Sequence, residues 1–409
     1  MKIYLKLIPC LIFAGLLGPV RVMAAPLPAN RSLPWDLATL FQVPATHPCT
    51  QCAVPGMHAC FYEGLEFKAR PTWVFAYYAA PEGQAPAGGW PAVVCVHGGG
   101  GTAYPEWVKT WNRHGYAALA MDVEGHLPEG QFPNRRWHEN AGPSRVMAFM
   151  DIELADREQW FYHAVADVVR GHSLLRSFPE INPDKIGLTG ISWGGTIVSA
   201  VAGVDSRFAF VVPVYGCGFV HESGGEGCQR WFRAMSGEQL KSYRTKWDPS
   251  VHLPFAQMPI LWVNGSNDSF GELGIWQHSA LTAPGPHTLC VRLRMPHGHA
   301  AGWEPREIYA FADSITKAAV PLPVAGRPEL EAGSNLARCK TQGKITKAEL
   351  CYTTQDGAWP TRTWASVPGV VNPDAVSAAI PQATTAFFFN VNDSRDCLTS
   401  SELVEIKGR

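Results

Sequence analysis

The stretch Ile186–Val198, with the sequence IGLTGISWGGTIV, decides the fold. It runs from an apolar, strand-like segment through a corner of small residues into a helix-like segment, and Ser192 stands at the corner. Gly190 and Gly194 flank this serine in a G-x-S-x-G arrangement. At a sharp strand-to-helix turn the backbone of the central residue is strained, so only small residues fit two positions to either side. The stretch therefore predicts an exposed serine nucleophile with a helix N-terminus behind it.

The segments around this corner predict an α/β domain with a doubly wound, mostly parallel sheet. Short apolar segments alternate with helix-period segments from about Phe61 to Thr316. The expected strands are Thr72–Pro81, Ala92–Val96, Tyr116–Met121, Lys185–Gly190, Phe208–Val214, Ile260–Gly265 and Thr288–Met295. The expected helices are Glu106–Gly115, Arg157–Ser177 and Glu304–Ala319.

Two long polar stretches interrupt this alternation, Glu124–Asp156 and Gly216–Gln257. Insertions over the carboxyl edge of such a sheet commonly line a ligand pocket. Their tryptophans either form pocket walls or pack the insertions against the sheet, and both interpretations stay open. These residues are Trp137, Trp231 and Trp247, together with Trp160 just beyond the end of the first stretch.

A carboxylate and two histidines follow later strands. A serine hydroxyl is a weak nucleophile and needs a base that a carboxylate orients. Asp268 follows the strand Ile260–Gly265, and both His297 and His299 follow the last strand of the series. We prefer His299 as the base because the small residues Gly298 and Ala300 beside it leave room for a sharp turn. His297 would then shape the loop or contact the substrate, and it stays the second candidate.

A run of four glycines, Gly98–Gly101, ends the strand-like segment that begins at Val94. Their unobstructed N–H groups, with the N–H of Trp193, can form an oxyanion hole. The run lacks the Lys-Ser/Thr ending of a phosphate-binding P-loop and the spacing of a dinucleotide-binding motif. We therefore expect neither a metal nor a cofactor.

The N-terminal residues 1–24 are typical of a signal peptide. Lys2 and Lys6 precede an apolar run, Leu7–Val20, and a small-residue cleavage site lies near Ala24. We expect a secreted or periplasmic protein without stable membrane insertion, because the run is too short to span a bilayer comfortably.

Export makes disulfides the default use of the ten remaining cysteines. Cys217 and Cys228 suit a local bridge, whereas Cys95 and Cys290 lie in strand-like segments and suit buried free thiols. Bridging is also preferred over a zinc knuckle for the cluster Cys49, Cys52 and Cys60 with His47 and His58. One further bridge is expected, with unassigned pairing, among Cys339, Cys351 and Cys397.

The C-terminal part differs in pattern. Residues 320–330 are Pro-rich and predict a linker, and residues 331–409 contain alternating β-rich segments that predict a small Ig-like β-sandwich. Residues 25–319 would form the catalytic domain. All candidate catalytic positions precede the linker, so we expect the sandwich to take no part in the chemistry.

Four motifs together resemble a known family. They are HGGGGTAYPEW (His97–Trp107), GISWGG (Gly190–Gly195), VNGSND (Val263–Asp268) and MPHGHAAGW (Met295–Trp303). They resemble a secreted bacterial branch of the α/β-hydrolase serine esterases, near the acetyl-xylan-esterase, dienelactone-hydrolase and prolyl-oligopeptidase-like groups. The resemblance covers roughly Trp73–Thr316 and implies an α/β-hydrolase fold. It assigns Ser192, Asp268 and His299 as nucleophile, acid and base, and it implies the oxyanion donors Gly99, Gly100 and Trp193.

The chain of 409 residues is 46% hydrophobic and 17% charged, with a formal net charge of −1. This near-neutral balance gives no electrostatic basis for nucleic-acid binding. We expect hydrolysis of a small-molecule or polysaccharide ester through an acyl-enzyme, and the resemblance favours an acetyl-xylan-type esterase. Two alternatives stay open: a prolyl-oligopeptidase-like peptidase, and a glycan-binding protein with an idle hydrolase core. The sequence does not predict the oligomeric state.

Overall fold

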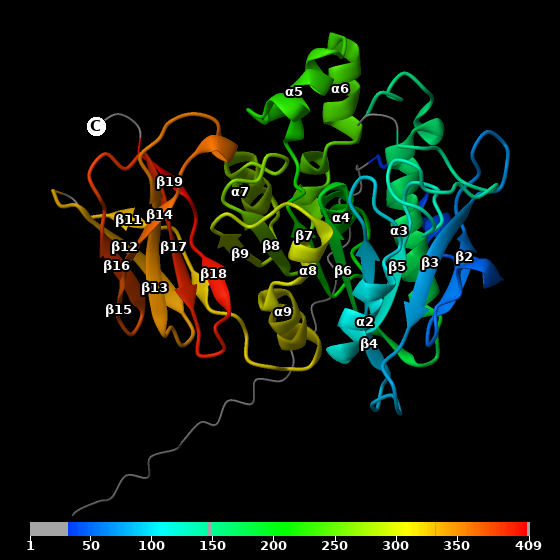
Figure 1. The fold of residues 1–409 in the computed structure, drawn as a ribbon, viewed down its shortest axis with the longest axis horizontal. Coiled ribbons are helices and arrows are strands. Elements are labelled where there is room, and N and C mark those ends of the chain that lie inside the picture. The colour runs from blue at the N-terminus through cyan, green and yellow to red at the C-terminus, as the bar shows by residue number, and fades with distance from the viewer. Residues whose placement is uncertain (1–31, 146–148, 332, 407–409) are drawn as a thin grey trace, which may run out of the picture.

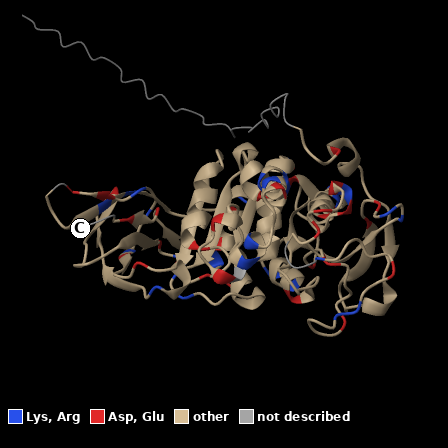
Figure 2. Cartoon of the chain, turned by 90° about the horizontal axis from the view of Figure 1, so that it is seen from above, with Lys and Arg blue, Asp and Glu red and all other residues tan. Residues whose placement is uncertain are grey.

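The computed structural model describes residues 32–145, 149–331 and 333–406. The signal peptide expected at residues 1–24 lies outside these ranges. Within them, no helix is both long enough and apolar enough to cross a lipid bilayer. Lys and Arg are interspersed with Asp and Glu along the described chain (Figure 2), which agrees with the near-zero net charge.

A large mixed sheet forms the centre of the molecule (Figure 1). Its strands from β4 to β9 are parallel to one another, and β3 joins them antiparallel through β5. The N-terminal part has the spatial order β1 (Thr46–Pro48), β2 (His58–Glu63), β3 (Trp73–Ala79), β5 (Ala117–Met121), β4 (Trp90–Val96), β6 (Ile181–Ile191), β7 (Phe210–Val214), β8 (Ile260–Gly265) and β9 (His287–Arg292).

Helices cover both faces of this sheet, which explains why its strands are apolar without interruption. In β4, Val94 and Val96 pack into one core cluster, and Val93 and Cys95 pack into the cluster on the opposite face. Helices α3 (Trp160–Arg176) and α4 (Trp193–Val204) contribute to the first cluster, and α2 (Pro105–Arg113) and α9 (Arg306–Thr316) to the second. The other α-helices in the described residues are α1 (Leu37–Leu40), α5 (Glu226–Arg233), α6 (Gly237–Lys246), α7 (Leu273–Thr282) and α8 (His299–Trp303).

The C-terminal region is all β, as expected, and it continues the central sheet. Strand β18 (Leu398–Ser400) pairs antiparallel with β9, so Ser400 lies opposite Leu289. The sheet goes on through β17 (Ala386–Asn392), β13 (Lys347–Thr353) and β14 (Ala365–Pro368), while β19 (Val404–Glu405) pairs with β17. A second sheet packs against these strands through β12 (Leu336–Gln342), β16 (Ala375–Ala379) and β15 (Val370–Val371).

The stretch expected to be only a linker also contributes to the second sheet. Strands β10 (Val324–Ala325) and β11 (Glu329–Leu330) lie within it, and both pair with β12. A proline-rich segment can provide such short edge strands because proline is tolerated where one side of a strand stays unpaired.

The cysteines differ from the expectation of disulfides. All ten cysteines in the described ranges are free thiols, including Cys217 and Cys228, for which a local bridge was predicted. Both side chains are buried in the core cluster that contains α3 and α4, where a thiol packs as a small apolar group. Cys95 and Cys290 are buried free thiols, as predicted. No cluster of three His, Cys, Asp or Glu side chains in the described part of the chain is arranged to hold a metal ion.

The four tryptophans differ in burial. Trp247 of the second insertion and Trp160, the first residue of α3 just after the first insertion, are buried in the core. Trp231 lies partly buried with its ring centroid 5.8 Å from that of Trp193, and Trp137 is exposed. Helices α5 and α6 of the second insertion lie above the sheet at the end from which α4 starts (Figure 1).

Candidate active site

Ser192 stands at a sharp turn between β6 and α4. Its backbone has φ 57° and ψ −118°, a conformation that a residue with a side chain rarely adopts. The glycines make this turn sterically possible: a Cβ on Gly194 would lie 2.6 Å from the carbonyl oxygen of His97 and closer still to that of Val96. The strained conformation expected of a G-x-S-x-G nucleophile is therefore present.

Three side chains form a continuous hydrogen-bonded chain at this turn. The Ser192 hydroxyl lies 2.9 Å from Nε2 of His297, and Nδ1 of His297 lies 2.5 Å from Oδ2 of Asp268. Asp268 is buried, and its Oδ1 accepts the backbone N–H groups of Phe270 and Gly271 at 2.9 and 2.7 Å. This carboxylate can only accept, so His297 carries its proton on Nδ1 and has Nε2 free to accept from Ser192.

The structure places His297, and not the preferred His299, within hydrogen-bond distance of the Ser192 hydroxyl. His299 is the first residue of α8, and its Nε2 accepts the N–H of Gly98 at 2.8 Å instead of the Ser192 hydroxyl. Burial above all lowers the pKa of His299 to about 3, and the nearby His97, His297 and Arg135 act in the same direction. His297 lies in the loop just before the helix, and this difference of two positions puts it beside the serine.

The glycine loop offers fewer oxyanion donors than predicted. The N–H of Gly100 donates to both oxygens of Glu124, at 3.2 Å each, so it is not available to a substrate. Gly99 lies beside Trp193, because a Cβ on Gly99 would be 2.7 Å from Cδ1 of the indole. Gly99 and Trp193 therefore stay as the pair of candidate donors, with Gly100 removed.

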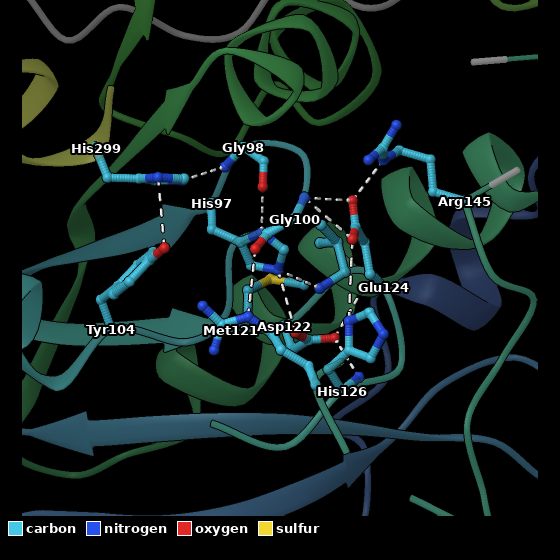
Figure 3. A network of polar contacts seen from close by, with 12 residues as sticks. His97, Gly98, Gly100, Tyr104, Met121, Asp122, Glu124, His126, Arg145 and His299 are labelled. Atoms are coloured by element: carbon cyan, nitrogen blue, oxygen red, sulfur yellow. Dashed lines mark hydrogen bonds and ion pairs between the residues drawn. The ribbon is translucent and has the colours of Figure 1, made fainter. Parts of the chain in front are cut away.

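Glu124 and Arg145 form an ion pair beside this loop. The Nε of Arg145 lies 2.5 Å from Oε1 of Glu124, and the side chains are 16% and 5% exposed. Figure 3 shows Glu124 and Arg145 facing each other. The guanidinium also lies over the ring of Trp193, 5.6 Å from its centroid. Arg145 thus compensates the charge of Glu124, the side chain that binds the glycine loop. Burial of an unpaired carboxylate at this place would be unfavourable.

Sequence reasoning missed Glu124 and Tyr215 as parts of the site. The ring of Tyr215 stacks on His297 with centroids 4.5 Å apart, and its hydroxyl donates to the carbonyl of Pro296 at 2.7 Å. Glu124 follows β5 after a short loop, and Tyr215 directly follows β7. Polar residues just past the carboxyl ends of parallel strands are the signal that could have identified both.

The C-terminal region contacts the loop that carries Asp268. The side-chain amide of the adjacent Asn267 donates to the carbonyl oxygens of Pro360 and Arg362, at 3.1 and 2.6 Å. Arg294 donates in turn to the carbonyl of Trp364 at 3.1 Å. The loop of Asp268 and the loop of His297 are thus both hydrogen-bonded to the C-terminal region. The predicted linker between the two regions did not suggest these contacts.

Two family models match parts of the chain. Residues 57–220 match the family described as Acetyl xylan esterase (AXE1), and residues 150–309 match the Prolyl oligopeptidase family. The two matches overlap across α3, β6 and α4, which contain the strained turn at Ser192.

Solved structures share the fold. An acetyl xylan esterase from Paenibacillus sp. R4 superposes with a TM-score of 0.54 at 21% identity, over 69% of this chain and 92% of that one. Acetyl xylan esterase 1 from Thermoanaerobacterium sp. JW/SL YS485 gives a TM-score of 0.53 at 15% identity, over 69% and 94%. The fold is therefore that of the α/β-hydrolases. Together with the family matches, it indicates a carboxylic ester hydrolase.

Proposed function

We propose that this protein is a secreted serine esterase that removes acyl groups from a carbohydrate, of the acetyl-xylan type. The hydrogen-bonded chain Ser192–His297–Asp268 at the strained turn carries the proposal. The match of residues 57–220 to acetyl xylan esterases supports the substrate class. Export rests on the signal-peptide pattern in residues 1–24.

The reaction proceeds in two steps through an acyl-enzyme. The Ser192 oxygen attacks the ester carbonyl carbon while Nε2 of His297 takes the hydroxyl proton. Asp268 stabilises the imidazolium through its bond to Nδ1, and the N–H groups of Gly99 and Trp193 hold the oxyanion. His297 then gives the proton to the leaving alcohol. In the second step a water molecule attacks the acyl carbon while Nε2 of His297 takes its proton. The bond from the Ser192 oxygen to the acyl carbon then breaks, and His297 returns the proton to Ser192 as the acid leaves.

We propose that the mature chain is organised in three parts. Residues 25–319 supply the catalytic groups, residues 320–330 connect, and residues 331–409 form the accessory β-sandwich. The contacts of Asn267 and Arg294 support a β-sandwich that stabilises the loops of the site. They argue against a β-sandwich that is independent of the site.

The test is hydrolysis of p-nitrophenyl esters, acetylated xylan and peptide anilides by the purified protein and two serine variants. Ser192→Ala is expected to lower kcat at least about 10³-fold with an unchanged Tm. Ser199→Ala is the matched control, because Ser199 lies on the same helix and its hydroxyl donates to the carbonyl of Gly195, at 2.8 Å. A folded Ser192→Ala variant with a tenth of the wild-type activity would contradict the proposal.

The match of residues 150–309 to the prolyl oligopeptidase family supports a peptidase as the second candidate. Cleavage of the anilides with a higher kcat/KM than the esters would favour it. Esters alone as substrates, with release of acetate from xylan, would support the carbohydrate esterase. Binding of xylan without any hydrolysis would favour the glycan-binding alternative.

A further inference from the structure

The peptide units of Gly98 lie between two imidazole rings (Figure 3). The N–H of Gly98 donates to Nε2 of His299 at 2.8 Å, and its carbonyl oxygen lies 2.7 Å from Nδ1 of His97. The same oxygen accepts the N–H of Gly101 at 2.9 Å. The first residue of the glycine loop is therefore fixed through both of its polar backbone groups.

The His299 ring is suited to accept a hydrogen bond at all ordinary pH values. Because the Gly98 amide donates to Nε2, that nitrogen carries no proton, and the neutral ring has its proton on Nδ1, which lies 3.4 Å from the hydroxyl of Tyr104. Burial above all, together with the nearby His97, His297 and Arg135, lowers the pKa of His299 to about 3, which keeps the ring neutral. A protonated ring would turn the acceptor into a donor and break the bond.

The ring also occupies the space that side chains on the loop would need. A Cβ on Gly101 would lie 2.9 Å from Nε2 of His299, and a Cβ on Gly98 would lie 3.3 Å from it. The glycines thus let the imidazole approach the backbone closely. An ordinary strand end does not require a side chain to approach the backbone so closely. The close contact between His299 and the glycines therefore indicates that the position of this loop is fixed.

The loop is held from its other side as well. The N–H of Gly100 donates to Glu124, which Arg145 holds in turn. The amides on both sides of Gly99 are therefore engaged with acceptors that come from two different segments, α8 and the loop after β5. With both neighbours fixed, the peptide between Gly98 and Gly99 has little freedom to rotate, and this peptide carries the N–H of Gly99.

We propose that His299 is a positioning residue: by accepting the Gly98 N–H, it fixes the direction in which Gly99 presents its own N–H to the oxyanion. The inference rests on the proposed function, in which Gly99 is an oxyanion donor. His299 itself neither touches the substrate nor transfers a proton. Removal of a complete oxyanion donor costs about 10²- to 10³-fold in kcat, so a misdirected donor is expected to cost somewhat less.

Two amide variants test this role. In His299→Gln the side-chain oxygen can reach the position of Nε2 and accept the Gly98 N–H. In His299→Asn the shorter side chain ends near the position of Nδ1 and faces Tyr104. We expect His299→Asn to lower kcat about 10- to 100-fold with KM within about threefold, and His299→Gln to stay within about fivefold of wild type. The kcat values are referred to active sites titrated with a phosphonate that reacts with Ser192, so only folded enzyme is counted.

A role in folding alone would not separate the two amides, because both fill the site with a polar group. Equal kcat values for His299→Gln and His299→Asn would therefore overturn the inference. His163→Gln is the matched control, because His163 is buried and its Nε2 bonds to the carbonyl of Arg157, at 2.8 Å, outside the site. It is expected to lower Tm and leave kcat and KM unchanged.

The failure of this inference is distinguishable from failure of the proposed function. If Ser192→Ala or His297→Ala keeps activity in the same assay, the proposed triad is wrong. If both abolish activity while the two His299 amides behave alike, the triad stands and only the positioning role of His299 is refuted.

Discussion

Replacing Asp268 with asparagine changes one carboxylate oxygen into an NH₂ group while the size of the side chain stays the same. In the structure both oxygens accept: Oδ1 accepts from Phe270 and Gly271, and Oδ2 accepts from Nδ1 of His297. An asparagine has one oxygen, so it must turn its NH₂ group toward one of these two sets of donors.

The two orientations have different costs. If the NH₂ group faces the backbone, two buried N–H groups lose their acceptor, at about 1–3 kcal/mol each. If it faces His297, the ring can adapt by moving its proton from Nδ1 to Nε2, and the hydrogen bonds are satisfied again. The second orientation costs less, but it leaves Nε2 of His297 unable to accept the proton of Ser192.

Asp268→Asn is therefore expected to fold and to lose catalysis. Loss of the correct tautomer is expected to lower kcat about 10³- to 10⁴-fold, which corresponds to roughly 4–5 kcal/mol of transition-state stabilisation. The assay is steady-state hydrolysis of p-nitrophenyl acetate, with Tm measured on the same preparation.

Asp248→Asn provides a matched control. Asp248 is also fully buried, with Oδ1 accepting the N–H groups of Phe219 and Ser250 at 2.8 and 2.9 Å and Oδ2 lying 3.2 Å from Nδ1 of His221. The same substitution there should lower Tm and leave kcat within about fivefold of wild type. A folded Asp268→Asn variant with kcat within tenfold of wild type would refute the reasoning, as would an equal loss of kcat in Asp248→Asn.

Three further perturbations have expected outcomes. Gly194→Ala should abolish soluble, folded protein, because its Cβ would collide with backbone carbonyls of the neighbouring strand; expression and circular dichroism check this. Burial acts to raise the pKa of Asp205, but His172 and Arg207 outweigh it and lower the pKa, so this group stabilises the fold above about pH 4 and the contribution is lost as the pH falls below that value. Asp205→Asn should cost about 3 kcal/mol and flatten the dependence of Tm on pH in that range, measured by calorimetry. A chain that ends after residue 317 should show a Tm lower by more than about 5 °C and a reduced kcat, and an unchanged Tm and kcat would contradict the observed interdomain contacts.

The strand and helix pattern of the catalytic domain could be predicted because each buried strand is a short, uninterrupted apolar segment. The expected strand Ile260–Gly265 coincides with β8, and the expected helix Arg157–Ser177 contains all of α3. The nucleophile turn was also predictable, since the steric needs of a strained turn select glycine at fixed positions. These features depend on interactions between residues that are close in the chain, so a short stretch of sequence is enough to predict them.

The choice between His297 and His299 could not be made from local sequence. Both residues lie in the same short segment, and Gly298 is a neighbour of both. What separates them is that α8 begins at His299, so its ring points to the glycine loop, while His297 stacks against Tyr215 from a distant part of the chain. The engagement of the Gly100 N–H by Glu124 is likewise a contact between segments that the sequence does not place together.

The relation of the C-terminal region to the site depends on an unpaired strand edge. Without the C-terminal region, strand β9 would be the exposed edge of the parallel sheet, and its central residues Leu289, Cys290 and Val291 are apolar, which favours pairing with another strand. The C-terminal region covers that edge: Ser400 Oγ accepts the N–H of Val291 at 2.7 Å, and the Asn390 side chain donates to the carbonyl of Val291 at 3.1 Å. The loop that carries His297, the proposed base, follows β9 directly, so the segment that completes the sheet also fixes the end of the strand just before this residue. In the proposed mechanism, a region attached in this way acts on the geometry of the triad through the backbone of β9 and contributes no reacting group.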